Sequence, residues 1–438
     1  MSFALQRLVH GYLHPWRHFA VAGGLVAVVG LAALGAAAVG LQSIPPASEP
    51  PRARVQPIGD PTTLRRLALE DLTYAGAFRL PATEVNGDSF SFGGQPMAYN
   101  PERNSLFVGT HSRRVAEVRI PEPVKGGELE ALPSALFLQP FEDPTEGHMK
   151  EVAPDGASLA GLLVHERRLI GTGLIYYDAN NTQAVSHFTR PLSLTERAVT
   201  GMVRVGPKGK SGFVAGYMAS VPPEWQSRLG GPAITGQCCV PVISRSSHGP
   251  SAFAFNPAEL AVGKPIDAAA LLYYPGDHQT LGPWEGSNPT YGGTTQVGGV
   301  ALIGGTSTAL FIGRNGTGPF CYGSGTSDRA VAGTRGPDSE IYCFDPSTSD
   351  KGQHAYPYHY QIWAYDLNEL AEVRAGKRDP WSVKPYGVWP LELPFPEKGV
   401  RIGGVAYDAA GQRLFIAQSQ ADRDGFAYRP LIHVFRIP

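Results

Sequence analysis

The sequence lacks an excess of either charge and has few cysteines. Its 37 Lys and Arg nearly balance 38 Asp and Glu, for a formal net charge of -1. No electrostatic feature therefore favours nucleic acid as a partner. Cysteine occurs four times, without a CxxC spacing and without an HxxxH spacing near any of the four, so we expect neither a metal nor a cofactor. A Gly-x-Ser-x-Gly nucleophile elbow is also missing, which argues against an α/β-hydrolase site.

Helix-favouring composition is lacking too. Methionine is scarce (5) and charged residues make up only 17%, whereas Gly (53) and Pro (39) are abundant. This composition is typical of short strands joined by many turns. With 42% hydrophobic residues, the chain has enough apolar surface for a sizeable core. We therefore expect an all-β fold with little helix.

The N-terminal region differs from the rest of the chain. Residues 19–41 form an uncharged apolar stretch long enough to cross a bilayer, and Arg7 and Arg17 precede it. By the positive-inside rule we expect a cytoplasmic segment over 1–18 and a transmembrane signal-anchor helix over 19–41. A Pro-rich stalk over 42–66 and an extracytoplasmic domain over 67–438, periplasmic or at the cell surface, then follow. Cleavage near the small residues 36–38 is the alternative.

A pattern of two glycines, a short apolar strand, a turn and then Leu-Phe-Val/Ile recurs along the chain. Its copies begin at Gly93, Gly298 and Gly403, and a looser copy begins at Ala160. Self-similar strand pairs of this kind indicate a repeat architecture. Apolar runs capped by turn residues supply further strands, at 135–138, 201–205, 270–274 and 386–391.

These strands predict a five-bladed β-propeller, with six or seven blades as the alternative. The strand over 72–80 has no partner nearby, and the C-terminal strand over 431–438 lacks a fourth neighbour. We expect these two strands to pair and close the ring, which removes free sheet edges. The third blade is degenerate, and we expect it to open at residues 211–215. Residues 368–375 form at most a short turn of helix.

The four cysteines allow one ordinary disulfide. We expect Cys321 to pair with Cys343, because an exported domain folds where disulfides persist. Cys238 and Cys239 are adjacent, so they form either a strained vicinal bridge or free thiols.

Two insertions, near residues 275–296 and 314–360, are expected on one face of the ring, where loops on a rigid scaffold carry binding residues. Aromatic rings can stack on sugar faces while polar groups bond the hydroxyls. The candidate ligand-binding residues are Trp284, Tyr291, Arg314, Asn315, His354, Tyr356 and Tyr358. Glycoside hydrolysis needs two carboxyl groups flanking the bond. The candidate catalytic residues, all placed just before inner strands, are Asp88, Glu151, Asp155 and Glu285.

Residues 354–368, together with 89–94 and 98–101, resemble a group of exported bacterial propeller proteins of unassigned function. This resemblance implies the fold and the compartment, and it carries over no catalytic residue. The architecture is also similar to that of five-bladed glycosidases such as the arabinanase and invertase groups. Those enzymes draw a carboxylate from each of the first three blades, whereas the third blade here opens with residues 208–212, which contain none.

Together these features predict a membrane-anchored extracytoplasmic propeller that acts on or binds an extracellular ligand, most plausibly a carbohydrate. If it is an enzyme, we expect a glycoside hydrolase. The alternatives are a non-catalytic glycan- or protein-binding module and a structural subunit of a membrane complex.

Overall fold

The computed structural model describes residues 59–154, 156–239, 245–337, 339–395, 397 and 399–438. The expected cytoplasmic segment and signal-anchor helix, most of the expected stalk and the candidate Asp155 lie outside these residues. None of the helices in the described part of the chain combines the length and hydropathy that crossing a bilayer requires.

The described residues form five four-stranded antiparallel sheets and one smaller sheet. In spatial order, the first sheet contains β2 (Met97–Asn100), β3 (Ser105–Gly109), β4 (Val115–Arg119) and β5 (Leu136–Glu142), and the second contains β6 (Ala157–His165), β7 (Arg168–Ile175), β8 (His187–Pro191) and β9 (Thr200–Val203). The third contains β10 (Met218–Ser220), β11 (Ala233–Thr235), β12 (Ala252–Phe255) and β13 (Ala269–Leu272), and the fourth contains β14 (Gln296–Ile303), β15 (Thr308–Gly316), β19 (Tyr358–Asp366) and β20 (Gly387–Pro390). The last sheet contains β21 (Ile402–Asp408), β22 (Arg413–Asp424), β23 (Ala427–Arg436) and β1 (Thr73–Arg79).

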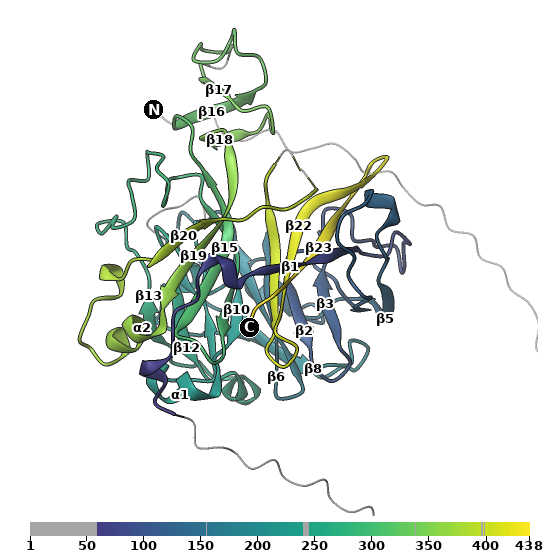
Figure 1. The fold of residues 1–438 in the computed structure, drawn as a ribbon, viewed down its shortest axis with the longest axis vertical. Helices are drawn as coiled ribbons and strands as arrows, with labels where there is room; N and C mark the ends of the chain where they lie inside the picture. The colour runs from purple at the N-terminus through teal and green to yellow at the C-terminus, as the bar shows by residue number, and fades with distance from the viewer. Residues whose placement is uncertain (1–58, 155, 240–244, 338, 396, 398) are drawn as a thin grey trace, which may run out of the picture. The chain divides into compact units, whose positions relative to one another are not determined.

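The sheets are arranged as a closed, propeller-like ring. Their first strands contact one another in the cyclic order β2, β6, β10, β14, β21 and back to β2. The N-terminal strand β1 completes the last sheet by antiparallel pairing with β23, from Tyr74 opposite Phe435 to Arg79 opposite Leu431. Figure 1 shows β1 lying across the C-terminal strands. The predicted pairing of the first and last strands is therefore confirmed.

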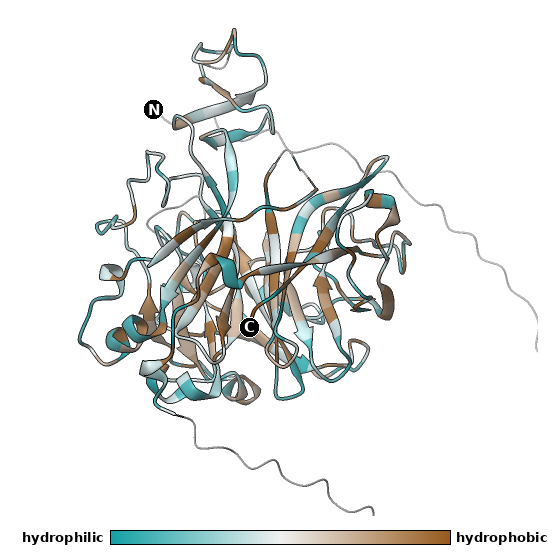
Figure 2. Cartoon of the chain, viewed as in Figure 1, coloured by the Kyte–Doolittle hydropathy of each residue, from teal (hydrophilic) through white to brown (hydrophobic). Residues whose placement is uncertain are grey.

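The hydrophobic core lies between neighbouring sheets, and it explains the repeated Leu-Phe-Val/Ile pattern. In β3, Leu106 and Val108 pack against the last sheet, whereas Phe107 packs against the sheet of β6 to β9. The three residues are fully buried because both faces of the strand are covered. Figure 2 shows the hydrophobic residues concentrated along the strands of these sheets.

The repeated glycines lie where neighbouring first strands approach closely. A Cβ atom on Gly298 of β14 would lie 2.4 Å from the carbonyl oxygen of Gly403 in β21. One on Gly404 would lie 2.5 Å from Cβ of Met97 in β2. The Gly404 N–H also donates a hydrogen bond to the carbonyl of Gly94 across this junction (2.7 Å). Glycine is thus required by the close packing of backbones around the ring axis.

Two local expectations were wrong. Residues 211–215 form no strand: Ser211–Phe213 is a 3-10 turn, and the third sheet begins at β10. The second concerns residues 368–375, where at most a short turn was expected, because the α-helix α2 spans Leu367–Arg374 and makes two turns. The Asp366 side chain caps this helix by accepting a hydrogen bond from the Asn368 N–H (3.0 Å). A further helix, α1, spans Pro223–Leu229.

Short 3-10 segments lie before β1 and in the connections between the strands. They are η1 (Pro61–Thr63), η2 (Leu69–Asp71), η3 (Leu129–Ala131), η4 (His148–Glu151), η5 (Ser211–Phe213), η7 (Pro257–Val262) and η8 (Pro380–Ser382).

The second insertion contains a small sheet of its own. Strands β16 (Cys321–Thr326), β17 (Tyr342–Phe344) and β18 (Lys351–His354) pair in the order β17–β16–β18, between β15 and β19. Figure 1 shows this sheet standing off from the four-stranded sheets at the end of β15 and β19. The predicted Cys321–Cys343 disulfide is confirmed and joins β16 to β17. Cys238 and Cys239 form a vicinal disulfide, the first of the two alternatives.

Candidate functional site

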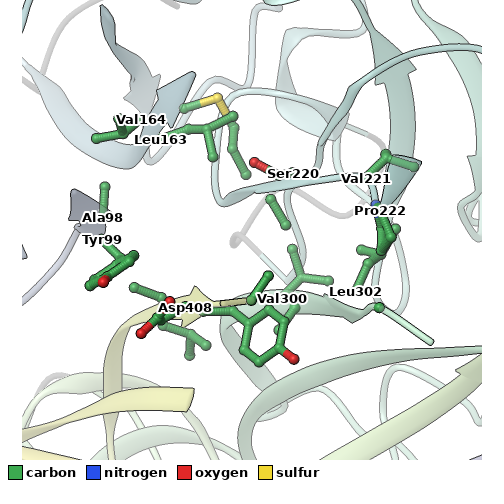
Figure 3. Close-up of a pocket in the computed structure, with 18 of the residues that line it drawn as sticks. Ala98, Tyr99, Leu163, Val164, Ser220, Val221, Pro222, Val300, Leu302 and Asp408 are labelled. Atoms are coloured by element: carbon green, nitrogen blue, oxygen red, sulfur yellow. The ribbon is translucent and has the colours of Figure 1, made fainter. Parts of the chain in front are cut away.

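An apolar cavity of about 480 Å³ lies among the first strands of the ring. All five four-stranded sheets contribute to it, and Figure 3 shows Ala98, Leu163, Ser220, Val300 and Asp408 around the opening. Two polar side chains of its wall bond to residues outside the cavity lining. Asp408 accepts from Arg413 (2.7 Å), and Tyr99 donates to Asn104 (3.3 Å). We refer to this space as the apolar cavity.

A larger cavity, of about 550 Å³, lies where the small sheet meets the ring, and we call it the polar cavity. It is lined by residues from β14, β15, β18 and β19, by the loop after β7, and by the chain just before β21. A neighbouring space of about 240 Å³ shares Tyr176, Cys239, Gln296 and Arg401 with it, so the two are adjacent.

A buried carboxylate forms the centre of one wall of the polar cavity. Asp345 accepts hydrogen bonds from the Tyr358 hydroxyl (2.7 Å) and from Ser347 Oγ (2.5 Å), and it contacts His354 Nδ1 (2.8 Å). The other His354 nitrogen faces the carbonyl oxygen of Gly323 (3.2 Å), so both ring nitrogens face acceptors. Burial would raise the pKa of Asp345, but these hydrogen bonds outweigh it and hold that pKa well below its ordinary value. Asp345 is therefore an ionised, fully engaged group.

Arg314 contacts the Tyr358 ring, so it lies next to the residues that surround Asp345. Its guanidinium lies 4.3 Å from the Tyr358 ring centroid, a cation–π contact, and Nη1 donates to the carbonyl of Gly399 (2.5 Å). The side chain is only 8% exposed. The structure thus brings together three of the predicted ligand-binding residues, Arg314, His354 and Tyr358, around one cavity.

The other predicted ligand-binding residues lie elsewhere in the insertions. Trp284 is buried in the core and packs 5.3 Å from the His248 ring, and Tyr291 is fully buried in the same core cluster. Asn315 is buried and joins the insertions, since its amide donates to the carbonyl of Asn288 (2.7 Å). Tyr356 is half-buried and packs edge-on against Tyr358. None of these four residues lines the polar cavity.

The three described candidate carboxylates each bond locally or stand in solvent. Asp88 accepts hydrogen bonds from Thr110 (3.2 Å) and Ser112, and Glu151 accepts from the Met202 N–H (3.2 Å) while contacting His148. Glu285 is exposed. None of the three lines the apolar or the polar cavity. Their catalytic role stays a prediction.

Several cavity residues were not singled out from the sequence. Tyr176 and Tyr177 are 59% and 68% exposed at the rim, and Arg401 and Asp345 lie in the wall. Two adjacent aromatic residues directly after a strand are a signal that could have been noticed. Asp345 could not, because its role depends on the fold of the small sheet. Within the described ranges, no three His, Cys, Asp or Glu side chains converge as a metal site would require.

Comparison with known proteins adds little to this description. No protein-family model matches the chain, and no curated protein matches it. Among solved structures, a luciferin-regenerating enzyme aligns over 85% of this chain and 94% of its own, at 7% identity and a TM-score of 0.32. The Dos1 propeller aligns over 78% of this chain and 67% of its own, at 8% identity and a TM-score of 0.28. The propeller-like description therefore rests on the strand pairing described above.

Proposed function

We propose that this protein is a membrane-anchored, extracytoplasmic binding protein, built on a five-bladed β-propeller, whose polar cavity holds a carbohydrate without cleaving it. One observation carries the proposal: the polar cavity combines hydrogen-bonding groups fixed in place, around Asp345 and Arg314, with the exposed rings of Tyr176, Tyr177 and Tyr322. Exposed rings supply apolar area for a sugar face, and fixed polar groups orient its hydroxyls.

Binding is favoured over hydrolysis by the state of the buried carboxylate in the cavity. A glycosidase needs a general acid that carries a proton and a second carboxylate across the bond. Asp345 is the buried carboxylate of the polar cavity, and its hydrogen bonds lower its pKa, so it stays ionised. Its oxygens are already occupied by Tyr358, His354 and Ser347. It is therefore suited to orienting neighbours rather than to donating a proton.

The proposed location draws on the sequence and on the disulfides. The apolar residues 19–41 behind Arg7 and Arg17 supply the anchor. Two disulfides are characteristic of a compartment outside the reducing cytoplasm. Fractionation of cells that express the full-length chain, followed by protease treatment from outside, tests this: we expect a membrane-bound protein whose domain is cleaved without lysis. Recovery in the soluble cytoplasm would contradict the proposal.

The binding function is tested by screening the full-length protein against cell-wall polysaccharides and scoring both retention and new reducing ends. We expect retention of at least one polysaccharide without reducing ends. Tyr177→Ala removes an exposed rim ring and should weaken retention about tenfold, in line with the loss of one stacking contact. Phe426→Ala is the matched control, because Phe426 is an exposed ring (96%) that does not line the polar cavity.

Two results would contradict the proposal in different ways. If the wild type releases new reducing ends from a polysaccharide and Asp88→Asn, Glu151→Gln or Glu285→Gln abolishes that release, the hydrolase alternative is established. Absence of retention for every polysaccharide would remove the carbohydrate-binding function itself.

A further inference from the structure

The Arg314 side chain is a buried cation without a counter-ion. None of its nitrogens lies within ion-pair distance of a carboxylate in the described residues, and the buried Nε has no hydrogen-bond partner. Asp345 and Glu397 act on it only from beyond that distance. Burial lowers the pKa of Arg314 to about 10, so it is charged at neutral pH. Burying an unpaired charge costs several kcal/mol in general, and an anionic ligand group beside Arg314 would offset that cost.

A second arginine lines the same cavity. Arg401 is half-buried, and no hydrogen bond or ion pair holds its guanidinium among the described residues. Both arginines line the polar cavity, and the charge of Arg401 disfavours the charged form of Arg314. Lys351, a third cation of the wall, has a partner in Glu340. Two arginines therefore line the cavity, and neither has an ion-pair partner among the described residues.

We propose that Arg314 and Arg401 form a carboxylate-binding subsite of the polar cavity, so that the ligand is an acidic glycan whose sugar carboxylate lies between the two guanidinium groups. The planar fork of arginine matches a carboxylate through paired N–H donors, which a lysine cannot do. The Tyr358 ring under Arg314 fixes the plane of that fork. The glycan nature of this ligand rests on the proposed function; the carboxylate subsite rests on the two arginines.

The test uses the full-length protein and two forms of one polymer, polygalacturonate and its fully methyl-esterified form, which keeps the sugar chain and removes the charge. We expect the acidic form to bind at least tenfold more tightly at low salt. Arg401→Gln and Arg314→Gln should each remove that preference, and Arg401→Gln should leave binding of the ester within about twofold. Arg436→Gln, a charge removed from an exposed position on β23 that does not line the polar cavity, is the matched control.

A second readout keeps the two proposals separable. Citrate, at constant ionic strength, should raise the melting temperature of the wild type but not of Arg401→Gln, since only a folded subsite binds it. Equal binding of both polymers, unchanged by the arginine variants, overturns the carboxylate subsite and leaves glycan binding intact. Stabilisation by citrate without binding of either polymer supports the subsite and rules out this polymer as its ligand. If citrate does not stabilise the wild type and the acidic polymer is not preferred, the carboxylate subsite fails, whereas glycan binding is decided by the polysaccharide screen described above.

Discussion

The buried His433 makes the closure of the ring sensitive to acid. It lies on β23, where Nδ1 is 3.1 Å from the Tyr74 hydroxyl of β1 and Nε2 is 2.8 Å from Gln418 Oε1. The side chain is fully buried. Burial lowers the pKa of His433 from 6.5 to about 3, so the ring is neutral in the folded protein.

The direction and size of the effect follow from proton linkage. Above pH 6.5 the imidazole is neutral whether the chain is folded or unfolded, so it costs nothing there. As the pH falls from 6.5 towards 3, the unfolded chain binds a proton that the folded protein excludes, and stability is lost. At pH 5 this loss is about 2 kcal/mol for His433. His187, whose pKa burial also lowers to about 3, adds a similar loss of about 2 kcal/mol.

Urea unfolding of the full-length protein at pH 8 and pH 5, followed by tryptophan fluorescence, measures this loss. His433→Gln removes the titrating group, so the difference in unfolding free energy between the two pH values should shrink by about 2 kcal/mol. His359→Gln, which changes an exposed histidine, should keep the full difference. If His433→Gln and the wild type lose the same stability between pH 8 and pH 5, the reasoning is wrong.

Three further experiments test the architecture. Replacing Cys321 and Cys343 by serine removes a disulfide that closes a loop with a sequence separation of 22 residues, so it should destabilise the small sheet by about 3 kcal/mol. Hydrogen exchange of β16 to β18 measures this loss, and exchange in the four-stranded sheets should be unchanged. Phe78→Ala should cost about 3–5 kcal/mol in urea unfolding, because the side chain is fully buried between β1 and its neighbours; a cost below 1 kcal/mol would contradict that packing. Gly298→Ala forces a Cβ onto a neighbouring backbone and should cost about 1–3 kcal/mol, whereas Gly352→Ala, with no atom within 4 Å of the new Cβ, should be nearly neutral.

The sequence predicted most of the ring because its signals are local and repeated. Each Leu-Phe-Val/Ile strand is buried on both faces by the sheets on either side, so hydrophobicity alone locates it. The third sheet was harder to place, because β10 and β11 have three residues each, too few to show a period. Residues 211–215 are equally apolar, and a 3-10 turn there differs from a strand only through its tertiary contacts.

The candidate site was predicted only in part, for a physical reason. Sequence reasoning selected aromatic residues of the insertions, but Trp284 and Tyr291 fill the core beneath them. A long loop needs its own buried aromatics as much as a ligand site does, and composition does not separate the two uses. Arg401 and Tyr176 come from segments distant in sequence, and only the closed ring brings them to the cavity of Arg314.

Because β1 pairs with β23, the ring can close only near the end of synthesis of the chain. Tyr74 reaches its partner Phe435 only after nearly all of the chain has been made. At the usual pace of translation, roughly 350 residues take about 20–70 s, so β1 spends that time as a strand without its partner. Unpaired strands join other chains readily, and the risk grows with waiting time. We therefore expect the yield of folded protein to depend on whatever shields β1 until the last strand arrives.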